Sequence, residues 1–256
     1  MAVSFLIGLL AGGFGGLVGL GGGAVMIPLM VRQLGLSQHQ AHGTSLMALV
    51  CTGLAGATTY ALNGSVDVLA AVCLAGAGML TAWVGAHAAH AMPPRQLRRA
   101  FGSFLVIVSV ILVLEPYLSP APHPVYGWHT ILILLCTGAL AGFISGLMGV
   151  GGGSIMVPAM VLLVGMGQHL AQGSALLAMV PAGAVGAIAH RRLGNVVTAI
   201  LPGLIAGIIL GTFLGGSLAH GLSDASLRLV FAVVLIGLGV RDIRSTSGIA
   251  APAEAD

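Results

Sequence analysis

The 256-residue sequence carries very little charge. Only 6% of its residues are charged and none is lysine, whereas about 25% of an ordinary soluble domain is charged. So few charges cannot cover a folded surface for water, and the mean hydropathy is +1.08. The composition therefore excludes a soluble globular protein and predicts an integral membrane protein in a lipid bilayer. In a membrane protein, the basic residues behind the net charge of +3 indicate which side of the membrane each loop lies on. No nucleic-acid partner is expected.

Cysteine is also scarce, and its placement argues against metal or redox chemistry. Cys51, Cys73 and Cys136 all lie inside apolar runs without CxxC spacing, which is typical of small buried side chains. The sequence has no GK[ST] motif of the kind that cradles a nucleotide phosphate. We therefore expect no cofactor, and an ATP-driven mechanism within this chain is disfavoured.

Carboxylate side chains are also scarce inside the apolar runs. Asp67, Glu115 and Asp224 fall at the ends of runs, so none is placed at the membrane midplane. This argues against a cation pump coupled through a carboxylate. A coupling proton would have to use histidine, although histidines at such positions are more often interfacial or packed side chains. The candidates are His42, His87, His90 and His220, of which His42 is the expected relay.

One glycine-rich phrase is written twice. Residues 19–28 read GLGGGAVMIP and residues 149–158 read GVGGGSIMVP, an offset of 149 − 19 = 130. The same offset aligns further residues without a gap, namely Gln38-His39 with Gln168-His169, His90 with His220, and Arg98 with Arg228. A fixed offset over a whole chain indicates a tandem duplication. The predicted division is a first transmembrane repeat (1–115), a proline-rich linker (116–128), a second transmembrane repeat (129–244) and a polar tail (245–256).

The arginines favour inverted repeats. Eight plain crossings would place the Arg95–Arg99 loop and the Arg191–Arg192 loop on opposite sides, against the preference of basic residues for the cytoplasm. If the runs 2–36 and 129–166 are hairpins that enter and leave on one face, all arginine clusters lie inside. The expected fold is an all-α polytopic membrane protein of two tandem inverted repeats. Each repeat has a broken re-entrant element and three transmembrane helices, and both termini are cytoplasmic.

The lengths of these two runs support hairpins. Runs of 35 residues (2–36) and 38 residues (129–166) would make about 53–57 Å of helix, too long for one crossing of about 30 Å. Pairs of part-depth helices broken near the middle fit this length. Eight plain crossings, with one arginine cluster outside, stay the alternative.

The glycine phrase predicts a break inside the membrane. Three consecutive glycines weaken a helix, and Pro28 and Pro158 each remove a donor from the following turn. Such backbone survives in lipid only where protein buries it or a cavity adjoins it. A half-helix that starts there offers N–H groups and a positive dipole end to an anion, and matching breaks in two halves are typical of a transporter's central site. The expected substrate-binding glycines are Gly21, Gly22, Gly23, Gly151, Gly152 and Gly153.

Other glycines have a different expected role. Gly12 and Gly16 in the first repeat, and Gly142 and Gly146 in the second, have the small-xxx-small spacing of closely packed membrane helices. We expect these four to pack helices and not to bind substrate.

A second polar feature follows each predicted hairpin. Residues 41–46 read AHGTSL and residues 171–176 read AQGSAL, again at an offset of 130. We expect each stretch to open the next helix. Its hydroxyls then either cap that helix or donate to an anion at the positive helix end, and both roles stay open. The expected substrate-binding side chains are Thr44, Ser45, Gln172 and Ser174.

Together the two features resemble the signature of the TauE/SafE family of anion transporters, also called TSUP. That signature is similar to GxGGGxxxxP followed by A-x-[GA]-[TS]-[SA]-L, given twice. Here it stands at Gly19–Pro28 with Ala41–Leu46, and at Gly149–Pro158 with Ala171–Leu176. The resemblance spans nearly the whole chain. It implies a permease of the bacterial inner membrane that moves small anions, often sulfur-containing ones such as sulfite, sulfonates or sulfoacetate.

The two halves of the sequence differ at two places within the stretch that resembles this family. Ser174-Ala175 stands where the first half has Thr44-Ser45, which removes one hydroxyl. The region of Tyr60 is matched by His190-Arg191-Arg192. The halves are therefore not chemically equivalent, and members of the family differ in substrate.

Two other classes of function remain as alternatives. Ser145 lies in GFISG, superficially like an intramembrane serine protease, but its repeat partner is Gly15. A catalytic serine needs a paired base, whereas a duplicated Gly/Ser position suggests packing. A non-transporting scaffold or accessory subunit would tolerate alanine in the glycine triplets, whereas a permease is expected to lose flux on Gly22→Ala while keeping its fold. The anion, the transport direction, the coupling ion and the oligomeric state stay open.

Overall fold

The computed structural model describes residues 1–19, 21–93 and 127–244, with scattered positions from 96 to 114. The described part consists of helices and holds no β-strand. In the first half these are α1 (Ala2–Val18), α2 (Gly23–Leu34), α3 (Gln38–Leu62) and α4 (Val68–Ala91). In the second half they are α6 (Trp128–Met148), α7 (Gly153–Ala159), a π-helical segment (Met160–Val164), α8 (Gln168–Arg192), a 3₁₀ turn (Thr198–Ile200), α9 (Leu201–Ala219) and α10 (Asp224–Arg244). Arg95, Arg98, Glu115, residues 116–126 of the predicted linker and the predicted tail lie outside the described residues.

Five described helices are long and apolar enough to cross a membrane. They are α3, α4, α6, α8 and the helix Thr198–Ala219 that the 3₁₀ turn forms with α9. Large apolar side chains point outward from them, such as Leu80 at 77% exposure and Leu218 at 62%. Outward leucines suit a lipid environment, where apolar surface costs nothing to expose. The predicted all-α polytopic membrane fold is confirmed.

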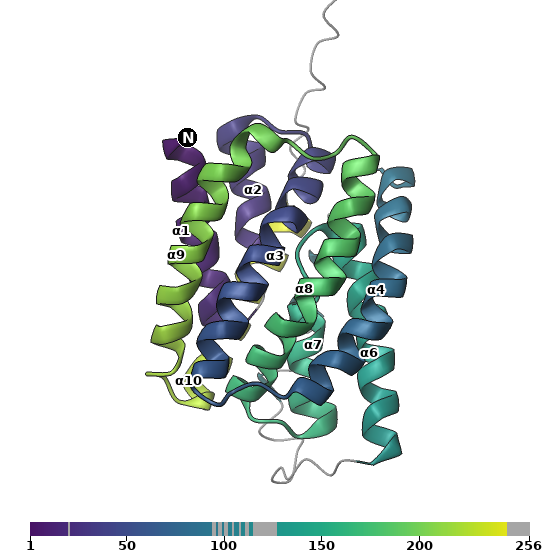
Figure 1. The fold of residues 1–256 in the computed structure, drawn as a ribbon, viewed down its shortest axis with the longest axis vertical. Helices are drawn as coiled ribbons and strands as arrows, with labels where there is room; N and C mark the ends of the chain where they lie inside the picture. The colour runs from purple at the N-terminus through teal and green to yellow at the C-terminus, as the bar shows by residue number, and fades with distance from the viewer. Residues whose placement is uncertain are drawn as a thin grey trace, which may run out of the picture.

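The first glycine phrase breaks its run into a helical hairpin. Beyond the end of α1, Gly19, Gly21 and Gly22 have φ of 74°, 81° and 78°, a left-handed conformation that favours glycine. The chain reverses there and α2 returns beside α1 (Figure 1). Gly15 of α1 lies against the backbone of Gly22. The predicted break in the first run therefore exists.

The second phrase makes a similar hairpin, with one difference after its proline. Gly149, which ends α6, and Gly151 have φ of 66° and 86°. α7 contains Pro158 and passes directly into the π-helical segment. α2 carries Pro28 at the corresponding position and stays α-helical.

Each hairpin has a long first limb and a shorter second one. α1 has 17 residues and α6 has 21, whereas α2 has 12, so their lengths are about 25, 31 and 18 Å. The predicted break falls near the middle of the second run, between the end of α6 at Met148 and the start of α7 at Gly153. By length and composition α6 could cross a membrane by itself, so the part-depth reach of this limb stays a prediction.

Glycines let the first limb of each hairpin pack tightly on a helix of the other half. A Cβ added at Gly12 or Gly16 of α1 would meet the backbone of α9, and one at Gly142 or Gly146 of α6 would meet the backbone of α4. Backbones approach this closely only where side chains are absent. The predicted packing role of these four glycines is confirmed.

α3 and α8 pack against each other and run in opposite directions (Figure 1). Gly43 near the start of α3 lies against Asn195, just beyond α8, and Gly173 near the start of α8 lies against Ser65, just beyond α3. The α3–α4 loop and the α8–α9 loop are therefore at opposite ends of the bundle. Helices at corresponding sequence positions run in opposite directions, as inverted repeats require, while the duplication itself stays a prediction.

The two ends of the bundle differ in charge. The start of α3 shares one end with Arg32 in the last turn of α2, and with Arg191 and Arg192 in the last turn of α8. We call this the arginine end. The opposite end holds Asp67 and the start of α8, and we call it the aspartate end. The described residues thus follow the predicted charge map, and the cytoplasmic side stays a prediction.

Candidate functional site

The two hairpin tips meet inside the bundle. A Cβ added at Gly23, the first residue of α2, would meet the backbone of Gly149 and Val150 in the other tip. The tips come from opposite ends, since α1 begins at the upper end of Figure 1 and α6 at the lower end. The sequence predicts that residues 21–23 and 151–153 approach each other. In the structure the contact is made by Gly23 on one side and by Gly149 and Val150 on the other.

The glycines of the first triplet fill crowded positions. A Cβ at Gly21 would meet the side chains of Leu49 in α3 and Met179 in α8, and one at Gly22 would meet the backbone of Ala11. Residues 21–23 and 151–153 are all buried. These glycines are therefore required for the tight turn, whatever else they bind.

Two side chains hold the carbonyl end of α1 at the first tip. Gln172 of α8 donates from Nε2 to Val18 O at 3.2 Å, and its Oε1 accepts from the Tyr60 hydroxyl at 2.8 Å. That hydroxyl also lies 3.0 Å from Gly16 O. Tyr60 and Gln172 are both 0% exposed. Gln172 therefore has both ends of its amide engaged with protein, and Tyr60 is a member of the site that sequence reasoning had noted only as a difference between halves.

His42 and Ser45 of α3 lie against the corresponding end of α6 at the second tip. A Cβ added at Gly149 would meet the Cα and Cβ of His42, and His42 Nε2 lies 3.1 Å from Nε2 of Gln38. The Ser45 hydroxyl lies within hydrogen-bonding distance of Gly149 O. His42 corresponds to Gln172, since 172 − 42 = 130, and each contacts the hairpin of the other half.

α3 and α8 begin earlier than the sequence pattern suggested. α3 starts at Gln38, where Ser37 and Gln40 form a capping box, and α8 starts at Gln168. The prediction that residues 41–46 and 171–176 open these helices is therefore wrong, and of the two roles left open for their hydroxyls, capping is excluded. For α3 the cause is the S-x-x-Q pattern at residues 37–40, which satisfies the first N–H groups one turn earlier, whereas α8 begins after Gly167 without a side-chain cap.

Thr44 and Ser174 instead bind the loops at the two ends of the bundle. Thr44 Oγ1 accepts from Val197 N at 3.0 Å, and Ser174 Oγ accepts from Asp67 N at 2.8 Å. The two contacts correspond, because 174 − 44 and 197 − 67 both equal 130. Each hydroxyl thus ties the central helix of one half to a loop of the other.

A buried hydroxyl with no hydrogen-bond partner lies beside the second tip. Ser154 follows Gly153 in α7, is 1% exposed, and its Oγ has no partner in the described part of the chain. Leaving a buried hydroxyl unpaired costs about 1–3 kcal/mol, so such a group calls for an explanation such as a ligand. Sequence reasoning missed Ser154. The signal was present, because the first half has Ala24 at the corresponding position.

The arrangement of the two tips suits a small anion. The carbonyl ends of α1 and α6 are held by side chains, whereas the first N–H groups of a helix have no intrahelical acceptor. α2 and α7 begin at Gly23 and Gly153, beside the meeting point, and neither has an acidic residue in its first turn. Among the described residues no group of three or more His, Cys, Asp or Glu could hold a metal ion. Positive helix ends and N–H donors therefore dominate this buried region.

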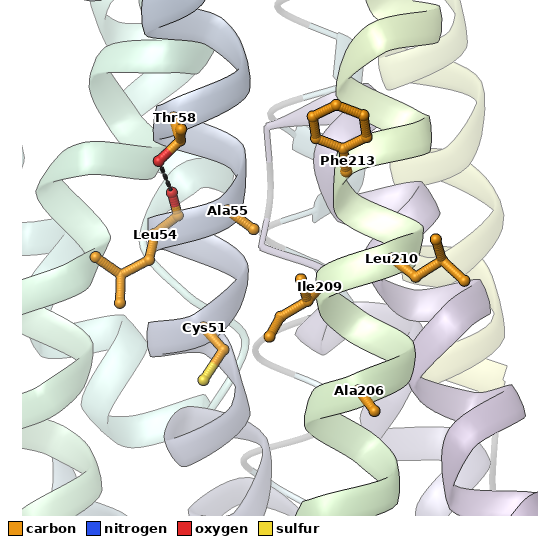
Figure 2. Close-up of a pocket in the computed structure, with 8 residues that line it drawn as sticks. All are labelled: Cys51, Leu54, Ala55, Thr58, Ala206, Ile209, Leu210 and Phe213. Carbon is orange, nitrogen blue, oxygen red and sulfur yellow. Dashed lines mark hydrogen bonds between the residues drawn. The ribbon is translucent and has the colours of Figure 1, made fainter.

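An apolar groove between α3 and α9 has different chemistry (Figure 2). It measures about 610 Å³ and is lined by Cys51, Leu54, Ala55, Thr58, Ala206, Ile209, Leu210 and Phe213. Its single hydroxyl, on Thr58, donates to Leu54 O at 2.8 Å. With no charged side chain, and only the weak donor of the Cys51 thiol besides that hydroxyl, this groove does not suit an anion.

The fold and the meeting tips together define a class of protein. A polytopic helical membrane protein with two broken helices that meet inside the bundle has the architecture of a secondary transporter. The sequence profile of the sulfite exporter TauE/SafE family matches residues 3–242. The chain belongs to this family of membrane transporters.

Curated relatives of this chain are described as membrane transporters or as a sulfite exporter family protein. The chain is 27% identical over 259 residues to the probable membrane transporter protein YunE of Bacillus subtilis, covering 91% of this chain and 94% of the relative. It is 30% identical over 234 residues to a probable membrane transporter protein of Xylella fastidiosa, covering 88% of each. Over 104 residues, 41% of this chain and 21% of the relative, it is 33% identical to sulfite exporter TauE/SafE family protein 3 of Arabidopsis thaliana. No solved structure matches the chain.

Proposed function

We propose that the protein is a secondary transporter of small anions, in particular sulfur-containing ones such as sulfite, sulfonates or sulfoacetate. The observation that carries this proposal is the contact of Gly23, where α2 starts, with Gly149–Val150, three residues before α7 starts at Gly153. The family's name and the transporter relatives support the class of substrate. We place the protein in a bacterial inner membrane with its arginine end and its termini in the cytoplasm, as the distribution of basic residues favours.

The proposed site binds an anion mainly through the protein backbone. N–H groups at the starts of α2 and α7, together with the Ser154 hydroxyl, donate to the oxygens of the substrate. Gln172 and Ser45 hold the nearby carbonyls of Val18 and Gly149, which would otherwise repel an anion. Such a site selects small oxyanions by charge and size, and it releases them readily because no arginine is placed in either tip. Thr44 and Ser174 contribute by bracing the loops.

Flux into proteoliposomes tests this function. A panel of sulfite, taurine, sulfoacetate and acetate is applied to vesicles with and without a proton gradient. We expect saturable flux of a sulfur oxyanion, at least about tenfold faster than that of acetate. If no anion of the panel moves in vesicles whose protein remains monodisperse, the proposed function is wrong.

Ser154→Ala is expected to weaken substrate binding without disturbing the fold. A hydrogen bond to a charged group contributes about 1.5–3 kcal/mol, so KM should rise about 10- to 100-fold. The fold should tolerate the change because the corresponding residue is already alanine, at Ala24. Ser4→Ala is the matched control, since Ser4 is also buried but donates to Met1 O at 2.8 Å, at the start of α1. An unchanged KM in Ser154→Ala would remove Ser154 from the site.

A further inference from the structure

A line of histidines leads from the surface at the arginine end to the second tip. His90 near the end of α4 is exposed, His39 near the start of α3 is half-buried, and His42 is 5% exposed. The rings of His90 and His39 lie 6.2 Å apart between centroids. His39 and His42 are three residues apart in α3 and so share one face of the helix. His42 lies against the second tip, since a Cβ added at Gly149 would meet its Cα and Cβ.

His190 adds an unused proton acceptor next to this line. It lies in the last turn of α8, is 0% exposed, and its Cβ lies beside Gly43, the neighbour of His42. Its Nε2 lies 2.9 Å from Gly146 O, to which it donates. Its Nδ1 is then the unprotonated nitrogen, and within the described residues this buried atom has no hydrogen-bond partner.

The aspartate end has histidines at the corresponding positions, but imidazoles do not continue from them to the first tip. His169 and His220 correspond to His39 and His90, and their rings lie 5.3 Å apart. The position of His42 is taken by Gln172, and that of His190 by Tyr60. Neither a carboxamide nor a phenol exchanges protons readily near neutral pH. An all-imidazole route therefore approaches a tip from one end only.

The histidine line shares its end of the bundle with aromatic and charged groups. On α4, Trp83 lies 4.9 Å from the His87 ring, and Arg192 of α8 stands 5.4 Å from the Trp83 ring centroid. The other described arginines at the arginine end are Arg32, Arg99, Arg191, Arg241 and Arg244, and α10 carries Asp242 between the last two. None of the described contacts of His39, His42, His90 and His190 is with a carboxylate that could stabilise an imidazolium. A bound anion would supply the missing negative charge, so anion and proton should bind together.

We propose that His90, His39 and His42, with His190 beside them, form a one-sided route that delivers a proton from the arginine end to the substrate site. The proton comes from water at that end and passes between imidazole nitrogens, with water bridging rings that do not touch. It rests on His42 while the anion is bound and returns by the same route when the anion leaves. The inference rests on the proposed function, because it requires an anion at the tips.

Proton uptake on anion binding tests the route directly. Sulfoacetate is the probe, because both its acid groups stay ionised near pH 7. Added to purified protein in weakly buffered solution with a pH-sensitive dye, it should cause uptake of up to about one proton per anion bound. His42→Gln, which copies the residue of the other half at Gln172, should bind sulfoacetate without proton uptake.

Sidedness is tested in proteoliposomes of uniform orientation. Lowering the pH at the arginine end from 8 to 6 should lower the KM for sulfoacetate about tenfold, and lowering it at the aspartate end should not. His39→Gln should slow this response, whereas the matched variant His169→Gln should leave it unchanged. Binding without proton uptake, uptake that persists in His42→Gln, or equal responses from both ends would overturn the route and leave the transporter intact. Absence of sulfoacetate binding to folded wild-type protein would overturn the route and count against the proposed site as well.

Discussion

Gly22→Ala is expected to remove most of the folded protein, and transport with it. Gly22 has a φ of +78°, and a Cβ added there would meet the carbonyl of Ala11 in α1. A side chain in the left-handed region costs about 1–2 kcal/mol, and forcing it into a filled space adds about 1–3 kcal/mol. The sum is a large share of a typical stability of about 5–15 kcal/mol. The measurement is the yield of monodisperse protein and its thermal midpoint in detergent.

Gly35→Ala is the matched control. Gly35 also has a left-handed φ, of +66°, but nothing lies within 4 Å of an added Cβ. It should lose about 1 kcal/mol for the backbone strain alone and still transport. If both variants melt at the same temperature, the collision with Ala11 is not what matters. The structure therefore revises the expectation from sequence that Gly22→Ala would abolish flux in a protein that keeps its fold.

Gly142→Val is expected to separate α6 from α4 and to prevent stable folding. A Cβ at Gly142 would already overlap the backbone of Gly78, including its carbonyl, and valine adds two further methyl groups. Overpacking of this kind costs about 3 kcal/mol when the neighbour is backbone that cannot rotate away. The second tip should be lost too, because α6 leads directly into Gly149. Thermal unfolding and size-exclusion profiles measure the effect.

Gly76→Val tests the same substitution on the partner helix. Gly76 lies within α4, and nothing stands within 4 Å of a Cβ added there. This variant should fold and transport like the wild type. A wild-type melting temperature for Gly142→Val, or a loss of folding in Gly76→Val, would show that close contact between α4 and α6 does not stabilise the protein.

Composition, repeat offset and arginine placement predicted much of the fold. Hydropathy is a property of each run by itself, so it identified the membrane helices without knowledge of their neighbours. The Arg191–Arg192 pair and Arg32 predicted that corresponding helices run in opposite directions, because basic residues prefer one side of a membrane. The break at each glycine triplet followed from local backbone preferences, which need no tertiary information.

The contacts between the halves could not be predicted in the same way. The offset of 130 pairs Thr44 with Ser174, but it does not show that each binds a loop of the other half. That contact depends on the antiparallel packing of α3 on α8. Ser154 was missed although it differs from Ala24 of the other half, because its burial without a partner depends on tertiary packing. The start of α3 was misplaced because the capping box at residues 37–40 was overlooked.

Hydrogen–deuterium exchange with and without sulfite tests most directly whether both tips bind one anion. If backbone N–H groups of both tips donate to the substrate, saturating sulfite should slow exchange in segments 19–27 and 149–157 together, by about tenfold or more, since bound amides must first be released. The loop at residues 63–67 serves as the internal control and should exchange at an unchanged rate. Protection of one tip only, or of neither while transport saturates, would contradict a shared site between the two hairpins.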